Sequence, residues 1–159
     1  MDKIWMGIDP GLGGGVGFIN NGKTNSFHTP TLKNSKGKNQ FNTPAMVDII
    51  TGSGTYNLEN IFCIIEAVHS MPGQGCVSVF SFGYGYGLWV GIVAALGIPY
   101  QLVAPQTWKK SLLQDTLKDK TASIVLAQQL FPDFHAKFKK DEALAEALLL
   151  AEYGRRIHK

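Results

Sequence analysis

Residues 61–66, with the sequence Ile-Phe-Cys-Ile-Ile-Glu, form a short apolar run that ends on a carboxylate. A run of this length without polar alternation is typical of a β-strand that is covered on both faces. A second short apolar segment, residues 3–9, also ends on an acid, Asp9, just before the glycine-rich stretch 11–15. Strands that are covered on both faces need helices on each side of their sheet, so this pair of segments predicts an α/β fold.

The remaining patterns complete a mixed sheet with helices packed on it. The Asn-Gly pair at 21–22 predicts a hairpin between strands at 16–20 and 23–28. We interpret residues 29–40 as a mobile loop, because they are polar and poor in apolar side chains. A strand is predicted at 98–103, and helices are predicted from Thr43-Pro44, over 76–97, from Pro105, over 118–131 and over 141–156. A chain of 159 residues is most simply one domain.

Composition argues against a membrane partner, whereas the charge leaves a nucleic-acid partner open. No apolar run approaches the roughly 20 residues that a membrane-spanning helix needs, so we expect no membrane partner. Cys63 and Cys76 lack metal-ligand spacing, which favours free thiols in a reducing cytoplasm. The net charge is only +3, yet ten of the fifteen basic residues lie from Lys109 onward. This asymmetry fits a C-terminal half that contacts phosphates, although ordinary solvated helix faces explain it equally well.

Four acids are candidates for chemistry. If strands 3–9 and 61–66 are neighbours, Asp9 and Glu66 lie side by side, and two such carboxylates repel unless a proton or a cation joins them. The last helix can bring Asp141 and Glu146 to the same point. Carboxylates without Cys or His ligands suit Mg²⁺ or Mn²⁺, and two such ions about 3.5–4 Å apart would support phosphodiester hydrolysis.

Each of these acids also has a structural explanation. Asp9 could be a turn residue, and Asp141 could cap the last helix. Glu66 and Glu146 are harder to explain in this way, because each is surrounded in sequence by apolar residues and a buried charge needs a partner. The glycine-rich stretch lacks the Gly-Lys-Ser/Thr ending of a P-loop, and no helix follows it as in a dinucleotide-binding fold. A similar start occurs in the sugar-kinase and actin-like ATPases, which are far longer.

Several short motifs occur together along the chain. In order they are GIDPG (7–11), IIE (64–66), MPGQG (71–75), SFGYGYGLW (81–89), PQTWKK (105–110), KDK (118–120) and DEALAEALLLAEYG (141–154). Together they resemble the RuvC-like Holliday-junction resolvases of the RNase H-like superfamily, most closely the compact phage and bacterial branch. The resemblance covers essentially the whole chain. It implies a single RNase H-like nuclease domain over residues 1–159, a mixed five-stranded sheet flanked by helices, and a location in the bacterial cytoplasm or a phage-infected cell.

The resemblance assigns two Mg²⁺ ions, for which Mn²⁺ substitutes, to Asp9, Glu66, Asp141 and Glu146. The sequence departs from the family pattern at one point. Asp141 is followed by Glu-Ala-Leu, whereas the family pattern has His-Gly-Arg at this place. Residues 141 and 146 are about 140° apart around a helix, whereas Glu142 and Glu146 share a face. Either Asp141 reaches the site from the start of the helix or Glu142 shares the role, and we favour Asp141.

The resemblance also implies contacts with DNA and between subunits. We expect Lys120 to assist catalysis, with a solvated surface residue as the alternative. We expect the loop after Glu66 to act as a wedge at a junction crossover, with a simple connection into the next helix as the alternative. The glycines of the 76–97 helix recur every four residues, and this spacing lets a second backbone approach closely. A four-way junction has near two-fold symmetry, so we expect a homodimer that forms through this helix. The full set of expected DNA-binding residues is Met71, Pro72, Gly73, Gln74, Lys109, Lys110, Lys118 and Lys120.

The function that these observations predict is a Mg²⁺-dependent endonuclease that resolves four-way DNA junctions with paired symmetric nicks, in DNA recombination or repair. A less selective nuclease that acts on flaps, other branched DNA or RNA–DNA hybrids is the alternative among enzymes. A non-catalytic protein that binds branched DNA is the alternative outside them, and the presence of all four acids argues against it.

Overall fold

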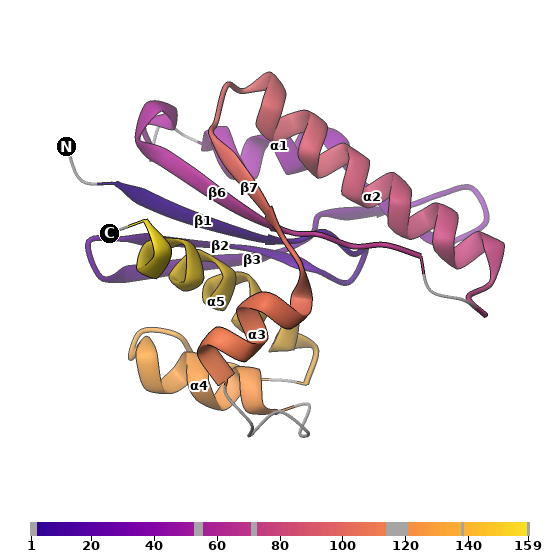
Figure 1. The fold of residues 1–159 in the computed structure, drawn as a ribbon. Coiled ribbons are helices and arrows are strands. Elements are labelled where there is room, and N and C mark those ends of the chain that lie inside the picture. The colour runs from indigo at the N-terminus through magenta and orange to yellow at the C-terminus, as the bar shows by residue number, and fades with distance from the viewer. Residues whose placement is uncertain (1–2, 53–55, 71–72, 114–120, 138, 159) are drawn as a thin grey trace.

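A mixed sheet of five strands forms the centre of the protein (Figure 1). The computed structural model describes residues 3–52, 56–70, 73–113, 121–137 and 139–158. The strands lie in the order β3-β2-β1-β6-β7, with β1 antiparallel to β2, β2 antiparallel to β3, and β1, β6 and β7 parallel. Their bounds are Ile4–Asp9 (β1), Gly15–Asn20 (β2), Lys23–His28 (β3), Ile61–Glu66 (β6) and Tyr100–Val103 (β7). The predicted mixed five-stranded sheet is thus confirmed, including the hairpin turn, where Asn21 and Gly22 have φ angles of 49° and 78°.

Helices cover both faces of the sheet (Figure 1). On one face, α1 (Thr43–Thr51) and α2 (Cys76–Ala95) pack on alternate strand residues such as Met6, Ile8 and Phe18. On the other face, α3 (Pro105–Leu113), α4 (Ala122–Leu130) and α5 (Glu142–Ile157) enclose a second core with Trp5 and Ile64. Two 3₁₀ turns, Leu58–Asn60 and Lys139–Asp141, precede β6 and α5. This two-sided burial explains why residues 61–66 are apolar without alternation.

Helix α5 lies unusually close to the sheet because glycines face it. Gly7 and Gly17 are paired across β1 and β2, and both are covered by the helix backbone. A Cβ atom at Gly17 would lie 2.7 Å from the Leu148 nitrogen, and one at Gly7 would collide with the Ala147 carbonyl oxygen. The first turns of α5 are therefore held directly against the strands that carry the candidate acids.

The prediction of a mobile loop at 29–40 was wrong. Strands β4 (Thr31–Lys33) and β5 (Asn39–Phe41) form a small second sheet. The Asn34 side-chain oxygen accepts hydrogen bonds from the amides of Lys36 and Lys38, and Gly37 has a φ of 72°, so the polar residues build a defined turn. At its end, Phe41 is buried against Gly85 of α2. Helix α1 begins at Thr43 as predicted, and the side-chain oxygen of Asn42 caps it by accepting a hydrogen bond from the Ala45 amide.

Helix α2 departs from the prediction that no run is long enough to cross a membrane. Among the described residues, Cys76–Ala95 is long and apolar enough to do so by length and composition. However, Gly85, Trp89, Ile92 and Val93 are buried on the side of α2 that packs in the core. A helix that packs on a sheet passes the same test, so this finding is weak evidence for a membrane.

Candidate active site

Asp9 and Glu66 lie side by side at one edge of the sheet. Strands β1 and β6 are parallel, and Ile8 is in register with Ile65, so the next residue of each strand is one of these acids. The pKa of Asp9 is raised to about 7, first by burial and then by the negative charges of Glu66 and Glu146. Burial also raises the pKa of Glu66. The two carboxylates thus share a partly dehydrated and electrostatically repulsive site.

Helix α5 brings Glu146 to the same place. Its charge raises the pKa of both Asp9 and Glu66. The Glu146 Oε1 atom accepts a hydrogen bond from the Ser123 hydroxyl at 3.2 Å and lies 2.7 Å from the Lys109 Nζ atom. The structure therefore brings together three of the four predicted acids, and Glu146 has the counter-ion that its apolar surroundings required.

Helix α3 supplies partners for two of these acids. The Trp108 indole N–H donates a hydrogen bond of 2.9 Å to Glu66 Oε1, and Trp108 is fully buried. This bond acts to lower the pKa of Glu66, against the larger effect of burial. Desolvation acts to lower the pKa of Lys109, yet its hydrogen bond with Glu146 and the negative charges around it leave that pKa raised. Sequence reasoning took Lys109 as a DNA contact and missed Trp108 and Ser123. The PQTWKK motif could have suggested Trp108, whereas Ser123, at the start of α4, left no signal in the sequence.

Asp141 lies at the start of α5 and has different partners. Its Oδ1 atom is 3.2 Å from His28 Nε2, and its Oδ2 atom accepts the Lys137 amide at 2.7 Å. His28 on β3 pairs with Gly15 on β2, and Gly15 pairs with Asp9 on β1. Asp141 therefore contacts the far end of a row of paired residues, one from each strand, that ends at Asp9. Glu142, by contrast, contributes to the raised pKa of Lys109. Asp141 is thus held beside His28, two strands across from Asp9, and Glu142 acts electrostatically on Lys109, so the assignment of Asp141 as a metal ligand stays a prediction.

The donor set of the site fits a hard cation. Within the part of the chain that the structure describes, no three His, Cys, Asp or Glu side chains already stand close enough to hold a metal ion. However, Asp9, Glu66 and Glu146 offer only carboxylate oxygens, the ligands that Mg²⁺ and Mn²⁺ prefer. Among the described residues, Lys109 is the positive group that the pKa of Asp9 responds to, and a divalent cation would relieve the repulsion by Glu66 and Glu146 that raises this pKa.

The glycine-rich stretch after Asp9 forms a tight turn. The Gly14 amide donates a hydrogen bond of 2.9 Å to the Gly11 carbonyl, and the Gly11 amide donates one of 3.4 Å to Asp9 Oδ1. A side chain at Gly14 would collide with the main chain of Asp9, whereas Gly13 faces open space. The turn is thus closed tightly on Asp9 and leaves room beside it.

The remaining predicted DNA contacts are only partly visible. Met71, Pro72, Lys118 and Lys120 lie outside the described residues, so the structure says nothing about them. Gly73 has a φ of 84°, and Gln74 lines a pocket against α2. Lys110 is exposed on α3.

Known proteins show what this architecture resembles. No family model matches the chain. The structure of Thermus thermophilus RuvC matches with a TM-score of 0.61 and 14% identity, over 98% of this chain and 96% of that one. The chain has the RuvC fold. A structure of T. thermophilus RuvC in complex with a Holliday junction substrate matches with a TM-score of 0.58, 15% identity and coverage of 97% and 96%.

A similarity in sequence to one known protein agrees with the similarity in fold to RuvC. The Holliday junction resolvase MOC1, chloroplastic, of Chlamydomonas reinhardtii is 28% identical over 96 residues. The match covers 59% of this chain and 11% of that protein, so the chain spans only a small part of this relative's length. The predicted RNase H-like architecture, a mixed sheet flanked by helices, is therefore confirmed at the level of fold.

Replacing Trp108 tests whether α3 positions Glu66. In Trp108→Phe the aromatic volume is largely kept, but Glu66 loses the hydrogen bond that favours its ionised form. We expect the affinity for Mn²⁺ to fall by about 10- to 100-fold, as for other partners of metal ligands. Isothermal titration calorimetry measures this affinity.

Trp89→Phe is the matched control. Trp89 is equally buried, in the core on the other face, and its Nε1 atom has no hydrogen-bond partner among the described residues. Its replacement should leave Mn²⁺ affinity unchanged. Equal affinities for wild type and Trp108→Phe would show that the indole N–H does not position Glu66.

Proposed function

We propose that this protein is a divalent-metal-dependent endonuclease that cleaves four-way DNA junctions with paired symmetric nicks. The convergence of Asp9, Glu66 and Glu146 at one edge of a RuvC fold carries the proposal, because burial and mutual repulsion prepare these acids for a cation. The similarity to MOC1 and to RuvC in complex with a Holliday junction substrate supports branched DNA as the substrate.

The proposed cofactor is a pair of Mg²⁺ ions, for which Mn²⁺ substitutes, held by Asp9, Glu66 and Glu146 with Asp141 as the fourth ligand. When bound, such ions lower the pKa of an attacking water and stabilise the leaving oxygen of a phosphodiester. Trp108 orients the carboxylate of Glu66 and favours its charged form. Lys109 offsets the charge of Glu146 and supplies a positive group at the edge where a DNA phosphate would arrive.

Cleavage assays on defined substrates test the function. The protein is incubated with Mg²⁺ and a labelled four-way junction, a flap, a linear duplex or an RNA–DNA hybrid. Symmetric nicks confined to the junction support the proposal. Equal cleavage of all substrates would favour a less selective nuclease, and tight junction binding without nicks would favour a non-catalytic branched-DNA-binding protein.

The fourth ligand is tested by comparing Asp141→Asn with Glu142→Gln. Asp141 is buried and hydrogen-bonded to His28, as ligating carboxylates usually are to outer partners. We expect Asp141→Asn to reduce Mg²⁺-dependent nicking by about 100-fold and Glu142→Gln by less than about tenfold. Single-turnover rates on a junction measure both. Full activity in Asp141→Asn together with a loss in Glu142→Gln would transfer the role to Glu142, which acts electrostatically on Lys109.

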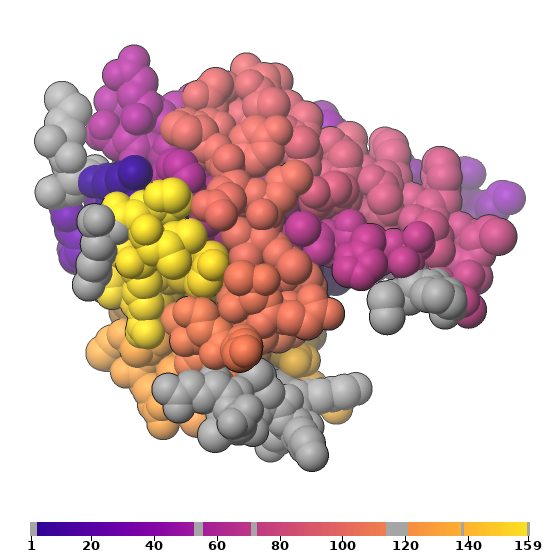
Figure 2. Space-filling model, viewed as in Figure 1, coloured from indigo at the N-terminus to yellow at the C-terminus, as the bar shows by residue number. Residues whose placement is uncertain are grey.

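We further infer that the protein acts as a homodimer through α2. Figure 2 shows the first turns of α2 extending outward from the rest of the molecule. Its outer side exposes Val77, Phe80 and Tyr84, and a groove of about 300 Å³ runs past Gly87 and Gly91, where added side chains would meet nothing within 4 Å. A second copy fits this surface, because paired nicks in a junction of near two-fold symmetry require two active sites in one assembly.

A charge on this surface should separate the subunits. Phe80 is 76% exposed and stacks on Tyr84, so Phe80→Lys removes an aromatic contact and places two like charges close together across a symmetric interface. We expect at least about tenfold weaker dimerisation, measured by analytical ultracentrifugation. Val125→Lys, at an apolar residue exposed on α4, serves as the control. A wild-type protein that is monomeric at micromolar concentration and still nicks junctions in pairs would contradict the proposal.

A further inference from the structure

The hairpin that β4 and β5 form over residues 31–41 is strongly basic and has no role in the mechanism proposed above. It carries three exposed lysines, Lys33, Lys36 and Lys38. No Asp or Glu occurs in the sequence between Asp9 and Asp48. Among the described residues, none of the three lysines has an ion-pair partner. The hairpin therefore concentrates positive charge that the rest of the protein does not neutralise.

The tip of the hairpin has a fixed backbone. The Asn34 side-chain oxygen accepts hydrogen bonds of 2.9 and 3.0 Å from the amides of Lys36 and Lys38. The Asn34 amide donates a hydrogen bond of 2.9 Å to the Lys38 carbonyl, and Gly37 supplies the positive φ of the turn. These bonds hold two lysines on one compact turn, so less conformational freedom is lost when both contact the same partner.

The base of the hairpin is attached at the end of the sheet that carries the acids. The Thr29 amide donates a hydrogen bond of 3.0 Å to the carbonyl of Gly14, in the turn that closes on Asp9. After the hairpin, the ring of Phe41 packs against Gly85 of α2. Figure 1 shows the hairpin beside the first half of this helix. A duplex whose cleaved phosphodiester lies at the acids therefore has the hairpin next to it.

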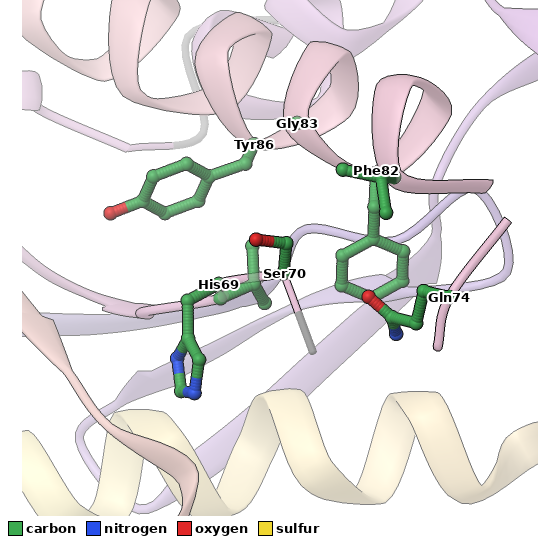
Figure 3. A pocket seen from close by; sticks show the side chains of 8 residues that line it. His69, Ser70, Gln74, Phe82, Gly83 and Tyr86 are labelled. Carbon is green, nitrogen blue, oxygen red and sulfur yellow. The ribbon is translucent and has the colours of Figure 1, made fainter. Parts of the chain in front are cut away.

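The hairpin and the segment that follows β6 lie on different sides of α2. Figure 3 shows Phe82 and Tyr86 extending from α2 toward that segment, where His69 lies. Gly85 is turned about 100° from Tyr86 around the helix, and it contacts Phe41 instead. Substitutions in the hairpin can therefore be tested without changing the loop after β6.

We propose that the hairpin binds the sugar–phosphate backbone of a duplex arm next to the cleavage site. Lysine presents a compact positive charge that attracts phosphates and reads no base sequence. Strand residues advance about 3.3 Å each, so the chain from Thr29 to Lys36 spans at most roughly 23 Å, or about seven base pairs of duplex. This inference rests on the proposed function and deepens it, because it names the element that holds a junction arm during cleavage.

A salt titration of DNA binding tests the hairpin without any cleavage. Binding of a labelled four-way junction is measured by fluorescence anisotropy at a fixed Ca²⁺ concentration in place of Mg²⁺, between about 50 and 200 mM salt. Each phosphate contact contributes about 0.9 to the slope of log affinity against log salt concentration. In Lys36→Gln/Lys38→Gln we expect this slope to decrease by about 2. The affinity at about 100 mM salt should fall at least about tenfold, equally for junctions of different sequence.

Lys3→Gln/Lys23→Gln is the matched control. It removes the same charge from two exposed lysines at the opposite end of the sheet, where β1 and β3 begin. Its slope and affinity should equal those of the wild type. Equal losses in the two double variants would overturn the proposal, because the effect would then follow net charge and not the hairpin.

The remaining outcomes separate the hairpin from the proposed function. Unchanged binding in Lys36→Gln/Lys38→Gln would overturn the hairpin contact alone. Phosphatidylserine vesicles that bind the wild type but not this variant, with DNA binding unchanged, would overturn it in favour of a lipid surface. A wild-type protein that binds junctions no better than duplex would overturn the proposed function. In that case a smaller slope for the variant on duplex would still support the hairpin contact.

Discussion

Asp9→Asn is expected to abolish metal-dependent nicking and to stabilise the metal-free protein at neutral pH. The loss of activity follows from the removal of a charge that the proposed metal site needs, and we expect it to exceed about 100-fold. The gain in stability follows from the environment of Asp9, whose pKa is raised to about 7 by burial and by the charges of Glu66 and Glu146. One substitution should therefore move activity and stability in opposite directions.

The sign of the stability change comes from proton binding. In the unfolded chain Asp9 releases its proton near pH 3.8, whereas in the folded protein it keeps the proton up to about pH 7. Between these values the folded state binds more protons, so the free energy of unfolding falls as the pH rises. At about 1.4 kcal/mol per pH unit, the penalty at pH 8 reaches at most roughly 4 kcal/mol. Asparagine carries no charge and avoids it.

Thermal unfolding in EDTA measures this effect. For a chain of this size each kcal/mol corresponds to about 2–4 °C, so the full penalty would raise the Tm of Asp9→Asn above that of the wild type by about 8–16 °C at pH 8. The difference should shrink toward pH 4.5, where the wild-type carboxyl is protonated in the folded state. Asp48→Asn, at an exposed acid on α1, should show neither the stabilisation nor the loss of nicking. A pH-independent Tm difference would refute the proposed origin of the effect.

The acids of the site could be predicted from the sequence because their positions depend on regular structure. Two apolar runs that each end on a carboxylate become adjacent parallel strands, and this alone places Asp9 beside Glu66. Glu146 could be predicted because a charge within an otherwise apolar helix needs a partner. These inferences require only local patterns and one assumption, that the two strands are neighbours.

The partners of the acids could not be predicted in this way. The bond from Trp108 to Glu66 joins residues 42 positions apart, and the pair of His28 and Asp141 spans 113 positions. Neither contact leaves a periodic signal, because each depends on how whole helices are seated on the sheet. The strands at 31–33 and 39–41 were missed for a related reason, since Phe41 is anchored under α2 by a long-range contact.

The seating of α5 leads to the second prediction with a large effect, for Gly7→Ala. An added methyl group would collide with the Ala147 carbonyl oxygen and lie 2.8 Å from Leu150 Cβ, so α5 would have to move away from the sheet. Overpacking of this kind costs about 1–3 kcal/mol or more, and the backbone of a central helix has little freedom to yield. We expect at least about 3 kcal/mol of destabilisation by urea unfolding. Because α5 also carries Glu146, Mn²⁺ affinity should fall as well.

Two comparisons separate this collision from a general effect of replacing glycine. Gly17→Ala, at the residue paired with Gly7, should destabilise the protein for the same reason, because its methyl group would lie 2.7 Å from the Leu148 nitrogen. Gly52→Ala should be nearly neutral, since no atom of the described residues lies within 4 Å of the added atom and the φ of −46° suits alanine. If Gly7→Ala and Gly52→Ala had equal stability, contact between α5 and the strands would not be what holds Glu146 beside Asp9 and Glu66.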